Sequence, residues 1–151
     1  MEKSWDKETL RTAIAAAVEA AAGNHFGAID QPELRMWAPP LIGFAAGEDP
    51  YFRFFKEDIG PFYWTPAEAY ALGRPEDPAS DGDLVSISLV FPQEEATKRE
   101  QRGQDRDPGP LWISSRNTWE PYMASVCGSI VETLSAYGIP AVAVDLLPEL
   151  V

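Results

Sequence analysis

The chain has 151 residues, a formal net charge of −12, 45% hydrophobic residues, one cysteine and one histidine. This length suits one α/β domain spanning residues 1–151, and such an acidic surface repels phosphate backbones and anionic membranes, so we expect neither as a partner. One cysteine forms no internal disulfide, and it cannot hold an iron–sulfur cluster or zinc without further ligands. The first ten residues carry no secretory apolar stretch, which predicts a cytoplasmic location.

The N-terminal part predicts a helix followed by a short strand. Ser4 or Asp6 can cap a helix that extends to about Ala22, because apolar residues recur there at helical spacing. Gly23 is placed to stop this helix. Residues 24–29 then favour a strand, although the glycines nearby weaken that interpretation.

The next segment predicts a strand and two short helices. Residues 41–46 are apolar and extended in character, which is typical of a buried strand. Asp49 can cap a helix over 50–59, with proline at its first position and a Gly-Pro pair to end it. Thr65 starts a capping box for a further helix over 66–73.

Aromatic residues are concentrated where these two helices meet. Of the 17 aromatic residues in the chain, seven lie within residues 51–64, which we call the aromatic elbow. Each ring brings roughly 150–250 Å² of surface that is costly to leave in water. The elbow must therefore line a core, a cleft or an interface. We expect most of its rings in the core and only Tyr63 and Trp64 facing outward.

The C-terminal half predicts a strand, a loop, a helix and a final strand. Residues 84–91 are rich in β-branched and apolar side chains, which predicts a central strand covered on both faces. Residues 93–109 are polar and of mixed charge, which favours a solvated loop. A helix over 119–137 and a strand over 140–144 follow. The expected fold is an α/β domain with a mixed central sheet covered by helices.

Motifs for catalysis or metal binding are missing from the sequence. There is no G-x-S-x-G, G-x-G-x-x-G, Walker or C-x-x-C pattern, so we assign no catalytic residue and no metal ligand. His25 is better explained as a structural residue than as a ligand. Cys127 lies on the apolar face of the helix over 119–137, and we expect a small buried side chain rather than a reactive thiol.

The segment PLIGFAAGEDPYFRFFKEDIGPFYWTPAEAYAL resembles the opening of epoxyqueuosine-reductase-like proteins, which combine a corrinoid-binding reductase module with a double 4Fe–4S ferredoxin module. The stretches VSISLVFPQEEATKRE and VETLSAYGIPAVAV are similar to the next parts of that family. Tyr63 or Phe62 stands where the family pattern has histidine. The residues that match the pattern are Pro40, Leu41, Gly43, Phe44, Ala45, Gly47, Asp49, Pro50, Phe52, Ile59, Gly60, Pro61, Thr65, Pro66 and Glu68.

The resemblance implies that the chain is the N-terminal part of a corrinoid-dependent oxidoreductase, inactive alone. Gly43, Phe44, Tyr63 and Trp64 are then the candidate contacts of a corrinoid such as cobalamin, because Gly43 lets a flat ligand approach the backbone. The family's cluster cysteines lie beyond the matching region, so no iron–sulfur cluster is expected in this chain. The implied partner is a C-terminal reductase and ferredoxin portion, or a second copy of the chain.

A free-standing, non-enzymatic domain is the alternative. It would use the aromatic elbow to bind a flat hydrophobic ligand or a partner protein. A self-sufficient hydrolase is disfavoured, because the sequence identifies no nucleophile with a base beside it.

Overall fold

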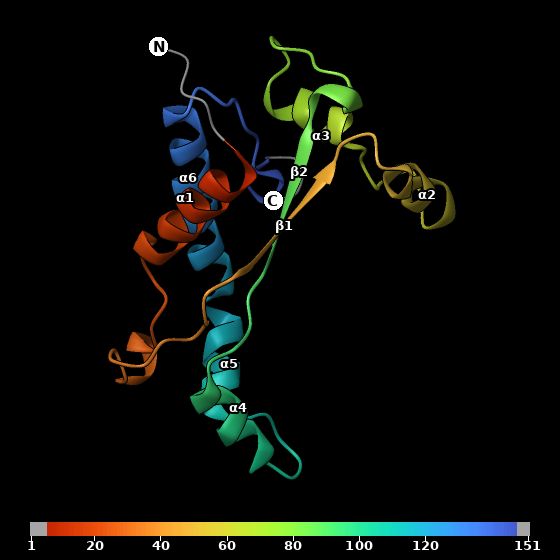
Figure 1. Cartoon of the computed structure of the whole chain (residues 1–151). Coiled ribbons are helices and arrows are strands. Elements are labelled where there is room, and N and C mark those ends of the chain that lie inside the picture. Colours follow the sequence, from red (N-terminus) through yellow and green to blue (C-terminus); the bar gives the residue numbers. More distant parts are fainter. Residues whose placement is uncertain (1–5, 148–151) are drawn as a thin grey trace.

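The computed structural model describes residues 6–147 (Figure 1). That range contains six α-helices, two strands and three short 3-10 turns. The helices are α1 (Lys7–Ala20), α2 (Pro50–Asp58), α3 (Pro66–Gly73), α4 (Glu95–Arg102), α5 (Pro110–Asn117) and α6 (Trp119–Ala136). The strands are β1 (Leu41–Ala46) and β2 (Val85–Val90), and the turns are η1 (Gly27–Ile29), η2 (Asp81–Asp83) and η3 (Val144–Leu146).

The sheet is a two-stranded antiparallel ribbon. β1 and β2 pair over their full length, from Leu41 opposite Val90 to Ala46 opposite Val85. The expected mixture of helices and strands is confirmed, but the expected mixed central sheet is wrong, because the described residues supply only these two strands to it. β2 is therefore a member of a narrow ribbon and not a central strand covered on both faces.

Two predicted strands do not form. Residues 24–29 instead contain the turn η1, which a single bridge between Phe26 and Gln31 closes. Residues 140–143 have no regular hydrogen-bonded structure, and η3 begins at Val144. Both segments were expected to add strands to the sheet. Because neither forms a strand, the sheet contains only β1 and β2.

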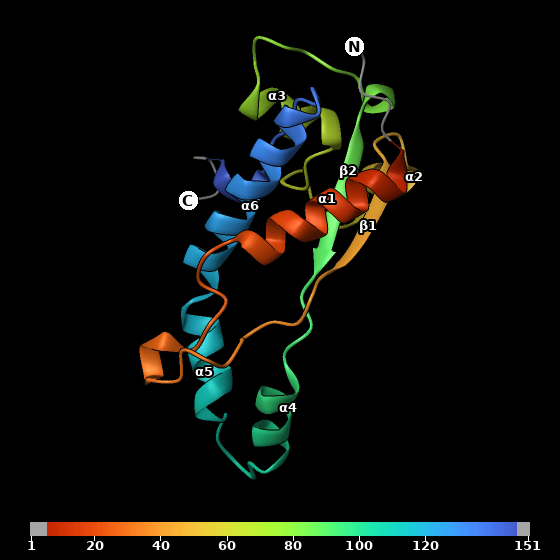
Figure 2. The same ribbon diagram turned by 60° about the vertical axis from the view of Figure 1, so that its left-hand side comes forward.

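The core lies between α1, α6 and one face of the ribbon. Ile14 of α1 and Val126 of α6 are fully buried. α1 passes in front of the strands and packs against α6, which runs beside them (Figure 2). Ile42, Ile87 and Leu89 pack against this cluster from the ribbon. Because side chains alternate along a strand, the other ribbon face points away from the core.

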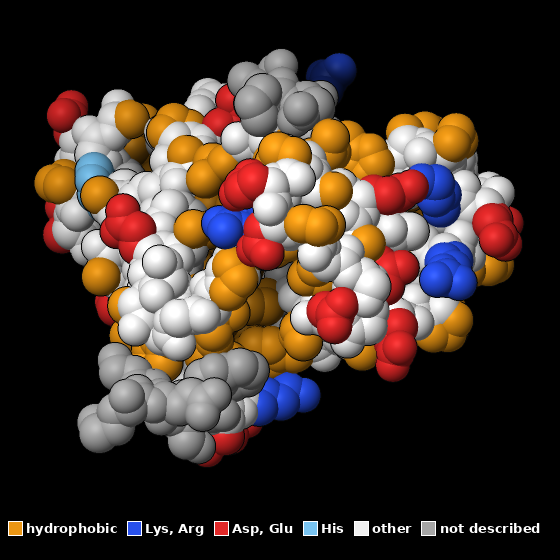
Figure 3. Space-filling view, turned by 90° about the horizontal axis from the view of Figure 1, so that it is seen from above, with side chains coloured by type: hydrophobic (Ala, Val, Ile, Leu, Met, Phe, Trp, Pro, Cys, Tyr) orange, Lys and Arg blue, Asp and Glu red, His pale blue; other side chains and the backbone are white. Residues whose placement is uncertain are grey.

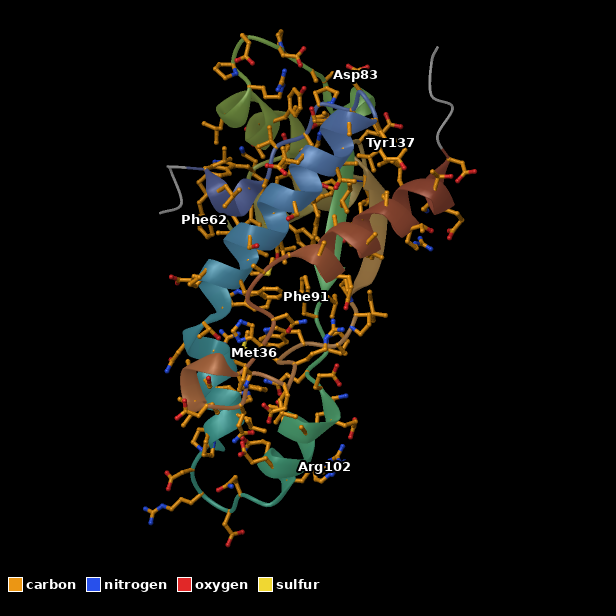
Figure 4. The ribbon with its side chains drawn as sticks, turned by 90° about the vertical axis from the view of Figure 1, so that its left-hand side faces the viewer. Met36, Phe62, Asp83, Phe91, Arg102 and Tyr137 are labelled. Atoms are coloured by element: carbon orange, nitrogen blue, oxygen red, sulfur yellow. The ribbon has the colours of Figure 1, made fainter. Side chains whose placement is uncertain are left out.

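The long C-terminal helix is confirmed. α6 follows the expected apolar face, with Tyr122, Val126, Ile130 and Leu134 all buried. The one cysteine, Cys127, is buried on this helix as expected. Phe91, which follows β2, lies in the interior beside α6 (Figure 4) and makes edge-on contact with Tyr122 at 6.0 Å between ring centroids.

The polar stretch at 93–109 is only partly a loop, which corrects the sequence interpretation. Eight of its residues form α4, and Thr97 of that helix is fully buried. The Glu100 carboxylate accepts a hydrogen bond of 2.8 Å from the Leu111 N–H, at the start of α5. The first N–H groups of a helix have no partner within that helix, and here a side chain of α4 bonds one such group of α5. The amino-acid composition of residues 93–109 does not reveal this tertiary contact.

Candidate functional site

The aromatic elbow is built by strong local signals at both helix starts. The Asp49 carboxylate accepts from the Tyr51 N–H at 3.0 Å, and Pro50 occupies the first turn of α2. Thr65 and Glu68 form the predicted capping box of α3. Gly60 follows the elbow's first helix with a φ of +157°, a backbone conformation that residues with a Cβ rarely adopt.

An ion pair joins the two helices. Lys56 of α2 donates to both carboxylate oxygens of Glu68, with 2.6 Å between Nζ and Oε2. Two hydrogen bonds to its carboxylate hold the pKa of Glu68 below its usual value. The bond from Lys56 has the larger effect, and the bond from the Thr65 N–H adds to it. The elbow angle is therefore fixed by capping and charge, although α2 has no buried residue.

Five of the seven elbow rings face solvent, which corrects the expectation that most of them are core. Phe52 and Trp64 are half-buried, although we expected Trp64 to face outward. Phe62 is 69% exposed and Tyr51 is 65% exposed. Phe54, Phe55 and Tyr63 are also exposed. These five rings contact one another in sequence, with centroids 5.3 to 6.4 Å apart, and none of them belongs to the core cluster. They form one continuous apolar strip.

The strip lies on a lobe that projects from the body of the protein. α2 stands apart from α1 and α6 in the ribbon view, on the far side of the strands (Figure 1). Seen from above, hydrophobic side chains lie between charged ones on this lobe (Figure 3). Exposed aromatic surface of this kind is unusual unless it serves an interaction.

A hollow of about 460 Å³ lies between the elbow, α3 and the outer ribbon face. Phe62 is at the edge of the molecule on this side (Figure 4). Ser86 of β2 and Val144 of η3 complete the wall opposite the aromatic rings. The lining residues are Phe52, Phe62, Tyr63, Trp64, Thr65, Pro66, Ala69, Ser86 and Val144.

The structure brings three of the four candidate ligand contacts to this side of the ribbon. Tyr63 and Trp64 line the hollow. Gly43 pairs with Ser88 on the same ribbon face as Ser86, but it does not line the hollow. Phe44 lies on the opposite face, where the Arg11 guanidinium of α1 is 5.6 Å from its ring centroid. Its ring belongs to the packing of α1 on the ribbon.

Several lining residues escaped the sequence interpretation. Phe52 and Phe62 lie in the elbow, but nothing in the sequence indicates which of its rings meet at one hollow. Ser86 reaches the hollow through strand alternation, because it is two residues from Ser88 on the same face. That alternation is the one signal that could have found it.

The two side chains with potential reactivity lie away from the hollow. His25 is exposed, and its Nδ1 accepts from the Gly27 N–H at 3.1 Å, which stabilises the turn around η1. Burial, and then the charge of Asp145, raise the pKa of the Cys127 thiol. Within residues 6–147 no group of three or more histidine, cysteine or acidic side chains could hold a metal ion.

The described residues do not fit a whole corrinoid. A corrin ring with amide groups around its rim is larger than this hollow and needs many hydrogen-bonding partners. The hollow offers mainly aromatic carbon, with the hydroxyls of Thr65 and Ser86 among its few polar groups. It can take the edge of a flat molecule, but further protein would have to enclose the remainder.

Comparison of the chain with protein-family models, with curated proteins and with solved structures found no match. The resemblance to epoxyqueuosine-reductase-like proteins stays a prediction from the residues that carry it. In the part of the chain that the structure describes, no helix is both long and apolar enough to cross a membrane.

Proposed function

We propose that this chain is a binding domain that docks a partner protein through the aromatic elbow. The observation that carries the proposal is the strip of five contacting rings that are exposed and lie outside the core. Aromatic side chains are enriched at protein interfaces, where they bury large areas at a small cost in conformational entropy.

The elbow is also suited to docking by its rigidity. The capping box and the Lys56–Glu68 ion pair fix the two helices before a partner arrives. A preformed surface loses less conformational freedom on binding than a mobile one. Arg53 and Lys56 lie beside the rings on α2, and charged groups at a rim favour a defined orientation of the partner.

Quantitative co-purification from the native host tests this proposal. The wild-type chain is compared with a Phe54→Ser, Phe62→Ser double variant, which removes two exposed rings and leaves the core intact. Ile113→Ser is the matched control, because Ile113 is 42% exposed on α5, away from the elbow. All three proteins are first shown to unfold at similar denaturant concentrations.

The proposal expects one or more host proteins to lose at least about tenfold in recovery with the double variant, since central interface residues contribute 2 kcal/mol or more. The same proteins should be recovered normally with Ile113→Ser. Equal recovery with all three chains would contradict docking through the elbow.

A corrinoid pocket wall is the second candidate, favoured by the hollow beside Tyr63 and Trp64 and by the family resemblance. In this candidate the chain would contribute an apolar edge to a reductase pocket, and a further portion of protein would supply the reductive chemistry. Titration of the chain with cobalamin, followed by its visible spectrum and by tryptophan fluorescence, tests this role. Saturable changes that Trp64→Leu reduces would support it, and unchanged spectra would count against it.

A further inference from the structure

The outer edge of β1 is unpaired. In the described part of the chain, each strand of this two-stranded ribbon has one edge without a paired strand. The edge of β2 lies on the side of α6, whereas the edge of β1 lies on the side away from it (Figures 1 and 2). Among residues 6–147, no backbone hydrogen bond joins β1 to any segment other than β2, apart from the turn bond from Asp49 N–H to the Ala46 carbonyl. Half of the strand's backbone groups therefore point outward without a protein partner.

This edge lacks the usual protection against pairing. Natural edge strands carry lysine, proline or a bulge, or they are covered by another element. The sequence LIGFAA of β1 has no charged residue and no proline, and it pairs with β2 in unbroken register. Leu41 at its start is 66% exposed. A two-stranded ribbon is marginal alone, and helices cover only one face of this one, so its β1 edge stays open to a further strand.

We infer that β1 accepts an extended segment of the partner protein as a third strand. Outward N–H and C=O groups at strand spacing are matched only by another extended polypeptide backbone, which defines the class of ligand. The inference rests on the proposed function, because β1 leads through residues 47–49 directly into α2. A partner seated on the elbow would reach this edge without crossing the core.

Charge indicates what flanks the partner's strand. At the ribbon end where β1 finishes and β2 starts, four carboxylates lie close in the chain to the paired residues Ala46 and Val85. They belong to Glu48, Asp49, Asp81 and Asp83. Arg53 contacts one of them, Asp81, at 3.7 Å and is itself 74% exposed. The partner's segment should therefore be apolar at alternate positions and carry lysine or arginine at the end that lies beside these carboxylates.

A second copy of this chain fits the edge poorly. Its β1 is preceded by Pro39 and Pro40 and followed by Glu48 and Asp49. Its β2 is flanked by Asp83 and Glu94. Neither strand brings basic residues, and each copy adds a net charge of −12. The occupant is thus a different protein.

Titration of the isotopically labelled full chain with a synthetic strand peptide, followed by nuclear magnetic resonance, tests the inference. The peptide has three Val-Thr repeats between paired lysines. We expect saturable shifts of the amide signals of residues 41–46 and slower hydrogen exchange at the outward amides. A peptide with alternate N-methyl groups should not bind, because it lacks the donors that complete the ladder.

Two comparisons sharpen the result. A peptide with glutamates in place of the lysines should bind at least about fivefold more weakly at low salt. Leu41→Lys should weaken binding of the lysine peptide by a similar factor of about five, because a charged side chain on an edge strand opposes pairing with another strand. Val90→Lys is the matched control, since Val90 faces Leu41 across the ribbon from β2 and is 60% exposed.

The inference is overturned if the β1 signals stay unchanged, if the N-methyl peptide binds equally well, or if the free chain is a dimer with its β1 amides already protected. These outcomes differ from failure of the proposed function. Loss of partner recovery with the elbow double variant, together with an inert β1 edge, would leave docking in place and remove only the added strand.

Discussion

Asn24 and Trp37 exchange two hydrogen bonds, each 2.9 Å long, between the asparagine side chain and the tryptophan backbone. The Asn24 amide oxygen accepts from the Trp37 N–H, and its amide nitrogen donates to the Trp37 carbonyl. The asparagine side chain thus makes the same pair of hydrogen bonds to Trp37 that a backbone residue of a neighbouring strand would make. It ties the segment after α1 to the segment before β1, and it thereby closes the core at that end.

Replacement of Asn24 by alanine should lower the free energy of unfolding by about 1–3 kcal/mol, because two partly buried backbone groups lose their partners. Urea unfolding followed by circular dichroism measures the change. His25→Ala is the neighbouring control, since His25 is exposed and its loss should cost about 0.5 kcal/mol or less. Equal effects of the two variants would show that the Asn24 contact is not a stabilising one.

The sequence predicted those elements whose signals are local. Asp6, Asp49 and the pair Thr65 with Glu68 cap helices where expected, and β1 and β2 lie within one residue of their predicted bounds. Segments decided by distant contacts were missed. Residues 24–29 do not join the sheet because the chain turns back on itself there, where the Phe26 N–H donates to the Leu34 carbonyl. α4 depends on contacts with α5.

At the candidate site, too, the sequence did not reveal which side chains would be buried by distant contacts. Aromatic area predicts that residues 51–64 contact a core, a cleft or an interface, but area alone does not tell these apart. Tyr51, Phe54 and Phe55 lie exposed on α2, and none of the residues of this helix is buried. Tyr63 and Trp64 were expected at a binding site and do line the hollow, whereas Phe44 turns to α1 through strand alternation.

Glu68→Gln should separate the charge of Glu68 from its capping role, because glutamine can still complete a capping box. At pH 7 we expect a loss of about 0.5 kcal/mol, as for a partly exposed ion pair. Glu68→Ala should cost about 1.5 kcal/mol, because the carboxylate that accepts from the Thr65 N–H is lost as well. Urea unfolding of all three proteins gives these differences.

The effect of Glu68→Gln should depend on pH in one direction. Since the pKa of Glu68 is lowered in the folded protein, its charge stabilises the fold above the ordinary glutamate pKa of about 4.3. That contribution is lost as the pH falls through the lower folded-state value. The gap between wild type and variant should therefore shrink as the pH falls below the ordinary glutamate pKa, and a gap that widened on acidification would contradict the ion pair.

Ile14→Ala should destabilise the protein by about 2–5 kcal/mol, because Ile14 is fully buried between α1 and the core and its truncation leaves a cavity. The midpoint of urea unfolding should fall without a change in slope. Ile113→Ala is the control, since that side chain is 42% exposed and should change stability by about 0.5 kcal/mol or less. A loss of less than about 1 kcal/mol in Ile14→Ala would show that Ile14 does not lie in the core.

Cys127 should react slowly with a disulfide reagent at pH 8 in the native protein. Burial and the charge of Asp145 raise the pKa of its thiol, so little thiolate forms and little of it is accessible. The reaction followed by absorbance should be at least about tenfold faster in 6–8 M urea, where the thiol regains its usual pKa. Equal rates in both conditions would show that α6 does not shield this residue.

Site-specific photo-crosslinking tests the central claim most directly. A benzophenone amino acid replaces Phe62 in one chain and Ile113 in another, and both chains are irradiated in the living host. Docking through the elbow predicts a discrete adduct from position 62 that mass spectrometry assigns to one partner and that Phe54→Ser diminishes. No adduct at position 62, or the same adducts from both positions, would contradict the account.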